Sequence, residues 1–208
     1  YLKILLKPLD EMLKIGLTGG IGAGKSEVSK FFKLWGAYIF DADQEAKAII
    51  DKNKIAQKEI IEEFGTDVVN KENKIEKKKL ARIAFQDDFH QSKLNAIVHP
   101  YVFKKIDETF QKIAQEDKHK IFVVDAALIY ESGADTHMDY VIVVTSLLRY
   151  RTERVMSKGQ ISRDDFMKRV NLQWSDEDKE QLADYVIQNN AGIKTLKKES
   201  KKIFENFF

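Results

Sequence analysis

A glycine-rich segment carries the clearest chemistry in the sequence. Residues 19–26 read GGIGAGKS and satisfy the pattern G-x-x-x-x-G-K-[ST]. Glycines permit positive φ angles and a close approach of backbone N–H groups, so such a loop can surround phosphate oxygens where a helix begins. Lys25 supplies a cation for the β- and γ-phosphates, and the Ser26 hydroxyl is an oxygen ligand that suits Mg²⁺. The predicted phosphate-binding residues of a nucleoside triphosphate site are Gly20, Ile21, Gly22, Ala23, Gly24, Lys25, Ser26 and Glu27.

A second position has the residue type and the context of a metal ligand. Residues 121–125 read IFVVD, four apolar residues followed by aspartate. This Walker-B pattern places a carboxylate beside the metal of a phosphate-binding loop, although aspartate at a strand end is also a common turn former or cap. Because the loop is present, we favour the metal role. Ser26 and Asp125 are therefore the predicted Mg²⁺ ligands.

A parallel sheet is the structure that would position these residues. Strand-like segments occur at 13–18, 37–41, 121–125, 140–145 and 185–188, and the third and fourth are rich in β-branched residues without alternation, as in strands buried on both faces. Helical patterns lie between them, the first beginning near Lys25. We predict an α/β fold in which helices flank a parallel five-stranded sheet.

The region between the second and third strands has no strand-like run. Amphipathic helical patterns occur instead around residues 44–51, 55–64, 76–86, 90–98 and 101–117. The histidine at 99 precedes Pro100, which is typical of a turn between the last two helices. These patterns predict a helical insertion packed on the edge of the sheet.

Composition limits the classes of protein that remain. The chain has 208 residues, no cysteine and a formal charge of +2. The absence of cysteine excludes a disulfide scaffold and a Cys-ligated metal site, and it fits a cytoplasmic location. No apolar run approaches the ~20 residues of a membrane-spanning helix, so we expect no membrane partner. Residues 1–11 precede Met12, and we expect them to be an N-terminal extension or residues added for expression.

Charge is distributed unevenly along the second half of the chain. Residues 146–173 hold seven Lys or Arg against three acidic residues, whereas residues 175–186 hold five acidic residues against Lys179 alone. A solvated helix face is the simplest explanation of either segment taken by itself. A nucleic-acid patch is a competing explanation of the basic one, but the adjacent acidic segment and the near-neutral whole argue against it.

Motifs separate the classes of phosphate-loop proteins. A GTPase needs an NKxD motif after a strand, but residues 73–76 read NKIE in a polar turn. An ABC-type ATPase needs an LSGGQ-like signature, which is absent. A small-molecule kinase is therefore the favoured class.

Six spaced segments then point to one family of such kinases. They read LTGGIGAGKS at 17–26, FDAD at 40–43, LNAIVHP at 94–100, DAALIYE at 125–131, RTERVMSKGQIS at 151–162 and VIQNNAG at 186–192. In this order and spacing the chain, from Met12 to its C-terminus, resembles the dephospho-CoA kinases. The resemblance implies Mg²⁺-dependent transfer of the γ-phosphoryl group of ATP to the ribose 3′-hydroxyl of dephospho-CoA, in a P-loop kinase fold. We expect ATP and dephospho-CoA as partners, no nucleic acid, and a monomer.

The family's architecture implies three regions within a single domain over residues 12–208. They are a nucleotide-binding core (12–42, 119–146 and 184–208), a helical acceptor-binding region (43–118) and a lid (147–183). Two alternatives stay open. One is another P-loop small-molecule or nucleoside monophosphate kinase, and the other is a nucleotide switch or a nucleic-acid-binding ATPase.

The resemblance also assigns roles to individual residues. Asp43 is the implied catalytic base, although an N-cap for the helix that follows would explain the same aspartate. Arg154 and Lys158 are the implied lid cations that act with Lys25. Asn189 and Asn190 are the implied adenine-side residues. The implied acceptor-binding residues are Thr18, Asp41, Asp43, Lys77, Asn95, His99, Leu128 and Glu131; packing is an equal alternative for Asn95 and His99.

Three positions depart from the family pattern. Lys158 and Lys77 stand where the family has arginine, which keeps the charge but loses the bidentate fork. Arg163 is a candidate substitute for the missing lid arginine. Ala127 stands where the family has proline, and we expect a looser loop there.

Overall fold

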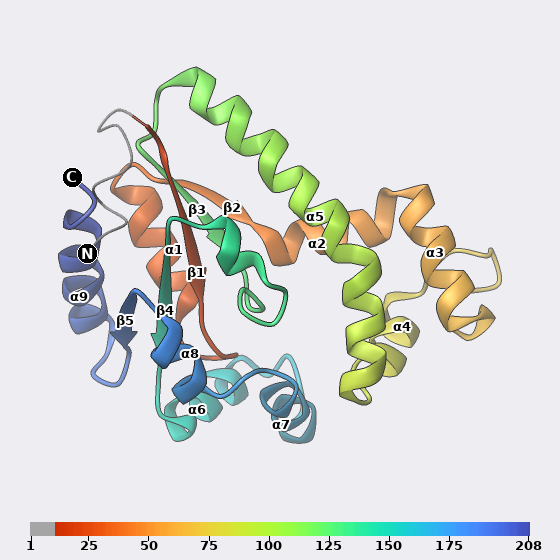
Figure 1. Cartoon of the computed structure of the whole chain (residues 1–208). Helices are drawn as coiled ribbons and strands as arrows, with labels where there is room; N and C mark the ends of the chain where they lie inside the picture. The colour runs from red at the N-terminus through yellow and green to blue at the C-terminus, as the bar shows by residue number, and fades with distance from the viewer. Residues whose placement is uncertain (1–10) are drawn as a thin grey trace.

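Five parallel strands form the sheet at the centre of the computed structural model, which describes residues 11–208 (Figure 1). Residues 1–10 of the predicted N-terminal extension lie outside the described residues. The strand order is β2-β3-β1-β4-β5, which confirms the predicted sheet. The strands are β1 (Leu13–Thr18), β2 (Tyr38–Asp41), β3 (Ile121–Asp125), β4 (Tyr140–Thr145) and β5 (Tyr185–Gln188).

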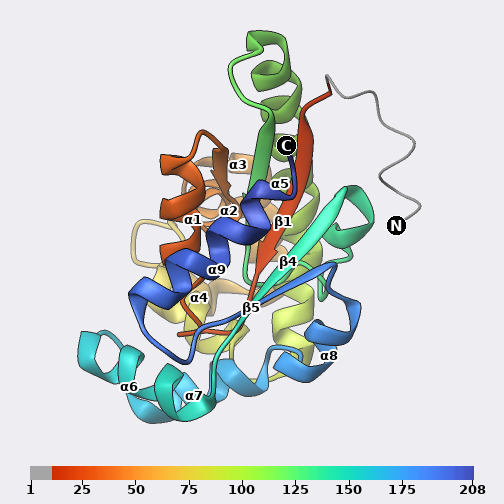
Figure 2. The ribbon, with the colours of Figure 1, turned by 90° about the vertical axis from the view of Figure 1, so that its left-hand side faces the viewer.

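Helices cover both faces of this sheet. Helices α1 (Lys25–Leu34) and α9 (Ile193–Glu205) lie together over one face, in front of the sheet in Figure 2. Ile15 and Leu17 of β1 belong to the buried cluster on that face. Phe122 and Val124 of β3 belong to the cluster on the opposite face, which the helical region covers. Both faces are therefore buried, which explains the continuous apolar runs in the strands.

The helical region between β2 and β3 extends beyond the edge of the sheet. It contains α2 (Ala42–Lys52), α3 (Lys54–Phe64), a 3-10 turn (Thr66–Val68), α4 (Lys77–Ala84) and α5 (Asp88–Glu116). Figure 1 shows α3 and α4 on the side of α5 that is remote from the strands. The predicted insertion is thus present as a bundle of helices joined to the sheet through α2 and α5.

Helix α5 corrects one sequence prediction. The predicted separate helices around 90–98 and 101–117 are a single helix of 29 residues with Pro100 inside it, so His99 lies in a helix and not in a turn. Leu94, Val98 and Val102 are buried at a spacing of four residues on both sides of the proline. Burial of this stripe outweighs the roughly 3 kcal/mol that a proline costs in a helix interior.

Three short helices gather at the carboxyl ends of the strands. They are α6 (Leu148–Lys158), α7 (Arg163–Asn171) and α8 (Asp176–Leu182), and they lie below the sheet in Figure 1. A 3-10 turn (Ala134–His137) precedes β4 on the chain. Among residues 11–208 no helix is both long and apolar enough to cross a membrane.

Candidate active site

The glycine-rich loop joins β1 to α1, as its motif requires. Gly24 has a φ of 108° at the N-cap of α1, and a Cβ on it would lie 2.2 Å from Asn189 Nδ2. A Cβ on Gly19, whose φ is 153°, would lie 2.2 Å from the carbonyl oxygen of Val144. Glycine is therefore required at both positions.

The loop presents several unsatisfied backbone donors. The N–H groups of Gly22, Gly24, Lys25 and Ser26 have no hydrogen-bond acceptor among the described residues. Two of them lie in the first turn of α1, where the helix dipole also favours an anion. The loop can therefore bind phosphate oxygens without first breaking bonds at these four groups.

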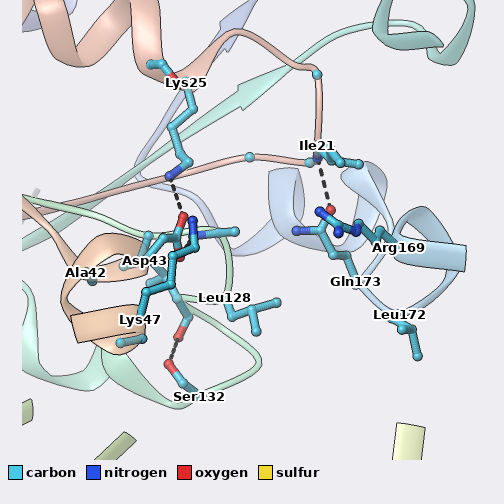
Figure 3. A pocket seen from close by; sticks show the side chains of 18 of the residues that line it. Ile21, Lys25, Ala42, Asp43, Lys47, Leu128, Ser132, Arg169, Leu172 and Gln173 are labelled. Carbon is cyan, nitrogen blue, oxygen red and sulfur yellow. Dashed lines mark hydrogen bonds and ion pairs between the residues drawn. The ribbon is translucent and has the colours of Figure 1, made fainter. Parts of the chain in front are cut away.

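Lys25 joins the loop to two carboxylates, Asp43 in the first turn of α2 and Asp125 at the end of β3. Its Nζ lies 3.2 Å from Asp43 Oδ2 (Figure 3). The same Nζ forms an ion pair with Asp125 Oδ1. Burial alone would lower the pKa of Lys25, but the charges of Asp43 and Asp125 outweigh it and raise this pKa above its ordinary value. Lys25 is therefore a permanent cation between the two acids.

The structure separates the two aspartates of FDAD. Asp41 ends β2 in register with Asp125 and caps α2, since its Oδ1 accepts the N–H of Gln44 at 2.8 Å. The capping role considered for Asp43 thus belongs to Asp41. Asp43 instead turns toward Lys25 and accepts the N–H of Ala127 at 3.2 Å through Oδ1. Its carboxylate is therefore oriented by two contacts in the cavity and serves no helix end.

The predicted metal ligands differ in their surroundings. Asp125 is buried and accepts hydrogen bonds from Lys25 and from the hydroxyl of Ser29, a contact that the sequence does not predict. Ser26 is exposed and lines the cavity next to the loop. Within residues 11–208 no group of three or more His, Cys, Asp or Glu could hold a metal. A hydroxyl with one or two carboxylates fits Mg²⁺, which commonly takes its other ligands from phosphates and water.

One cavity of about 850 Å³ connects the loop with the helical region and with residues 154–173 of the segment predicted to be a lid. Figure 3 shows Lys25, Asp43 and Leu128 on one side of it, and Gln173 and Arg169 on the other. Of the predicted site residues, the cavity is lined by Gly20, Ile21, Gly22, Gly24, Lys25, Ser26, Glu27, Asp43, Asn95, His99, Leu128, Arg154, Lys158 and Asn189. The structure therefore brings residues that were predicted to bind the nucleotide and residues that were predicted to bind the acceptor to a single space.

Other predicted residues lie behind this lining or outside it. Thr18 is buried and donates to the Ala127 carbonyl, and the side chain of Asn190 accepts the N–H of Leu147 at 2.9 Å. Lys77 is exposed and pairs with Asp51 at 2.6 Å. The predicted site residues that do not line the main cavity are Thr18, Ala23, Asp41, Lys77, Asp125, Glu131 and Asn190.

His99 faces the cavity from α5, together with Asn95 one turn away. Burial lowers the pKa of His99 below its ordinary value, so the neutral imidazole is favoured. Its ring lies 5.9 Å from that of Phe103. In this environment His99 is suited to hydrogen bonding and packing more than to charge pairing.

Two arginines of α6 hold the phosphate-binding loop through its backbone carbonyl groups. Arg154 donates to the carbonyl oxygens of Gly22 at 3.2 Å and Asn189 at 2.7 Å. Arg151, one helical turn earlier, donates from Nε to the carbonyl of Ile21 at 2.9 Å and pairs with Asp176. The sequence marks Arg151 only as part of the basic segment, although its spacing of three from Arg154 puts both on one helix face.

The acidic segment 175–186 is only in part the solvated helix face that its charge pattern indicates, since Glu177 and Asp178 are exposed but its one cation is not. Lys179 is fully buried, and its Nζ lies 2.7 Å from Glu131 Oε1. Glu131 also accepts the N–H of Trp174, and its Oε2 is buried without a hydrogen-bond partner among the described residues. The 125–131 loop and α8 are thus joined by a buried ion pair. The predicted contact of Glu131 with the acceptor stays a prediction.

We expect Lys179→Met to destabilise the fold by about 3–5 kcal/mol, because it leaves the Glu131 carboxylate buried without its cation. Urea unfolding followed by circular dichroism measures this loss. Lys168→Met is the matched control, since Lys168 is exposed on α7 and forms no ion pair within residues 11–208. Equal stabilities of the two variants would contradict the prediction.

Fold and site together define the class of protein. A parallel sheet of order β2-β3-β1-β4-β5, a phosphate-binding loop after β1, carboxylates at the ends of β2 and β3, and basic helices at the same edge are the parts of a P-loop kinase.

Comparison with known proteins then gives the family. The family model described as dephospho-CoA kinase matches residues 13–195, and the chain belongs to this family. A dephospho-CoA kinase of Aquifex aeolicus is 35% identical over 194 residues, which cover 93% of this chain and 97% of that protein.

Solved structures agree with this assignment. A dephospho-CoA kinase from Campylobacter jejuni has a TM-score of 0.66 at 28% identity, with coverage of 93% of this chain and 96% of that one. TT1252 from Thermus thermophilus has a TM-score of 0.80 at 26% identity, with coverage of 94% and 97%.

Proposed function

We propose that this protein transfers the γ-phosphoryl group of ATP to the ribose 3′-hydroxyl of dephospho-CoA, which yields CoA and ADP. The observation that carries the proposal is the shared cavity, which reaches from the phosphate-binding loop past Asp43 to Asn95 and His99 on α5. A nucleotide and an acceptor can therefore meet at Asp43. The three regions named above correspond to the walls of this cavity, and we propose the same boundaries for them.

Each wall supplies one part of the chemistry. Asp43 accepts the proton of the attacking 3′-hydroxyl while that oxygen forms a bond to the γ-phosphorus and the bond to the bridging β-γ oxygen breaks. Lys25 and the free N–H groups of the loop stabilise the charge that passes to ADP. Asn95, His99 and Leu128 contact the acceptor. Asn189 and Asn190 form the adenine-side end of the nucleotide site.

We also propose Mg²⁺ as the cofactor. Ser26 and Asp125 would hold it, and it would neutralise phosphate charge. The Asp125 carboxylate already accepts hydrogen bonds from a cation, Lys25, and from the hydroxyl of Ser29. These contacts hold it in place beside the loop, where a metal ligand is needed.

A coupled assay of ADP release tests the function. With MgATP present, dephospho-CoA is expected to support turnover, whereas nucleoside monophosphates, shikimate, DNA and RNA are not. No turnover with dephospho-CoA would reject the proposal. Turnover with a nucleoside monophosphate would favour the other kinase class, and turnover only with nucleic acid would favour the ATPase class.

Lys158 is expected to act as the mobile cation of the lid. It lines the cavity, is exposed at the end of α6, and forms no ion pair among the described residues, whereas Arg151 and Arg154 are engaged with the loop. We predict that Lys158→Ala lowers kcat by about 10- to 100-fold, because one donor to the transferring phosphoryl group is lost.

The conservative variant separates charge from geometry. Lys158→Arg is expected to keep kcat within a few-fold of the wild type, because the charge is preserved. Steady-state kinetics of the two variants measure both effects. An unchanged kcat in Lys158→Ala would assign the lid charge to another residue, with Arg163 and Arg169 as the next candidates.

A further inference from the structure

Gln173 is the lid residue that contacts the phosphate-binding loop through its side-chain amide. It lies between α7 and α8, and its Oε1 accepts the backbone N–H of Ile21 at 3.0 Å (Figure 3). The N–H that the loop motif offers to phosphate at Ile21 is therefore already bonded. No signal in the sequence marks this glutamine.

The N–H of Ile21 fixes the orientation of the Gln173 side-chain amide. A backbone N–H can only donate, so the atom facing Ile21 must be the carbonyl oxygen of the side chain. The other end of the amide, Nε2, is then a donor of two hydrogens and has no acceptor within residues 11–208. Gln173 lines the main cavity, so this donor is available to a ligand there.

Contacts on both sides hold Gln173 in place. Next to it, the N–H of Trp174 donates to Glu131 Oε1 at 3.0 Å, and the indole stacks on Tyr130 at 6.3 Å with an interplanar angle of 7°. The Arg151 guanidinium ties Ile21 to Asp176 on α8 through a pair whose side chains are 7% and 16% exposed. The amide is thus positioned before any nucleotide binds, which limits the entropy that binding costs.

The opposite wall shows which part of a nucleotide this donor would meet. Lys25 and Asp43 lie across the cavity from Gln173 (Figure 3). Lys25 is the β/γ cation of the loop, and the γ-phosphorus has to lie within reach of the base. The group between these two walls is therefore the γ-phosphate, whose oxygens accept hydrogen bonds.

We infer that Gln173 Nε2 donates a hydrogen bond to a γ-phosphate oxygen of ATP. Because ADP lacks this phosphate, Gln173 would distinguish ATP from ADP. The backbone N–H of Ile21 then contributes to nucleotide binding by orienting the Gln173 amide, and not by donating to a phosphate itself. The inference rests on the proposed kinase function, but the contact concerns the nucleotide alone. It can therefore be tested without an acceptor.

The sharpest variant keeps the oxygen and removes the donor. In Gln173→Glu a carboxylate oxygen still accepts the N–H of Ile21, but the second oxygen repels the γ-phosphate. Isothermal titration with MgATP and with MgADP is expected to show that ATP affinity falls by about tenfold or more, since a charge-assisted hydrogen bond is replaced by a like charge. ADP affinity is expected to stay near that of the wild type.

Two further variants keep the test decisive. Gln181→Glu adds the same charge on the exposed face of α8 and is expected to leave both affinities unchanged. Gln173→Met has a similar shape without a donor, and it is expected to lower the affinity for ATP more than that for ADP. It also carries the test if Gln173→Glu does not fold, as monitored by circular dichroism.

The outcomes are distinct from those of the functional assay. An unchanged ratio of ATP to ADP affinity in the Gln173 variants, or an equal loss of both affinities, would overturn the inference. A wild-type protein that fails to phosphorylate dephospho-CoA, but whose ATP preference falls in these variants, would reject the proposed function and leave the inference in place.

Discussion

Lys25→Ala is expected to lower the rate of phosphoryl transfer by about three orders of magnitude, because the only loop side chain that can neutralise charge between the β- and γ-phosphates is lost. The same change removes the cation that now joins Asp43 to Asp125. Asp125 is buried, so its carboxylate would lose its countercharge. We therefore expect a lower unfolding temperature in the absence of nucleotide as well.

ADP release with dephospho-CoA measures the first effect, and thermal unfolding followed by circular dichroism measures the second. Lys33→Ala is the matched control, since Lys33 lies on the same helix, is exposed and forms no ion pair in the described part of the chain. A Lys25→Ala variant that keeps turnover within tenfold of the control would show that another cation performs the role of Lys25.

Asp43→Asn is expected to reduce kcat by about 10²- to 10⁴-fold, the range for loss of a general base. The affinity for ATP should change much less, because the amide can still accept the N–H of Ala127 through its oxygen, and the loop that binds the phosphates is untouched. Separate measurements of kcat and of ATP affinity distinguish the two quantities.

Glu45→Gln provides the control for Asp43→Asn. Glu45 is in the first turn of the same helix, loses the same charge on conversion to an amide, and does not line the cavity. Its kcat is expected to stay at the wild-type value. If Asp43→Asn also turned over normally, Asp43 would be a structural partner of Lys25 and Ala127, and the proton would have another acceptor.

The sheet and the loop were predictable because their signals are local. β-Branched runs without alternation mark strands buried on both faces, and β3 and β4 begin and end where those runs do. The phosphate-binding motif specifies its own geometry through glycines, so Lys25 and the free N–H groups follow from spacing alone. Both steps need only neighbouring residues.

The remaining features depend on packing between distant segments. From the sequence alone, Pro100 predicts a break in the helix. Packing of the buried stripe Leu94, Val98 and Val102 against the rest of the protein keeps α5 continuous. In the sequence Lys179 belongs to an acidic segment that looks exposed. Only the fold brings Glu131, which lies 48 residues earlier in the chain, into contact with it. Such contacts have no local pattern, because folding decides which charged residues lose their water.

Residue 127 affects how the carboxylate of Asp43, the proposed base, is held. The resemblance described above implies proline there, whereas the Ala127 of this chain has an N–H that donates to Asp43 at 3.2 Å. Proline has no such hydrogen, so a rigid ring and a backbone donor are mutually exclusive ways to build this loop. Alanine at this position makes the main chain a hydrogen-bond donor to Asp43, the residue that we propose as the base, and so orients its carboxylate in a way that proline could not.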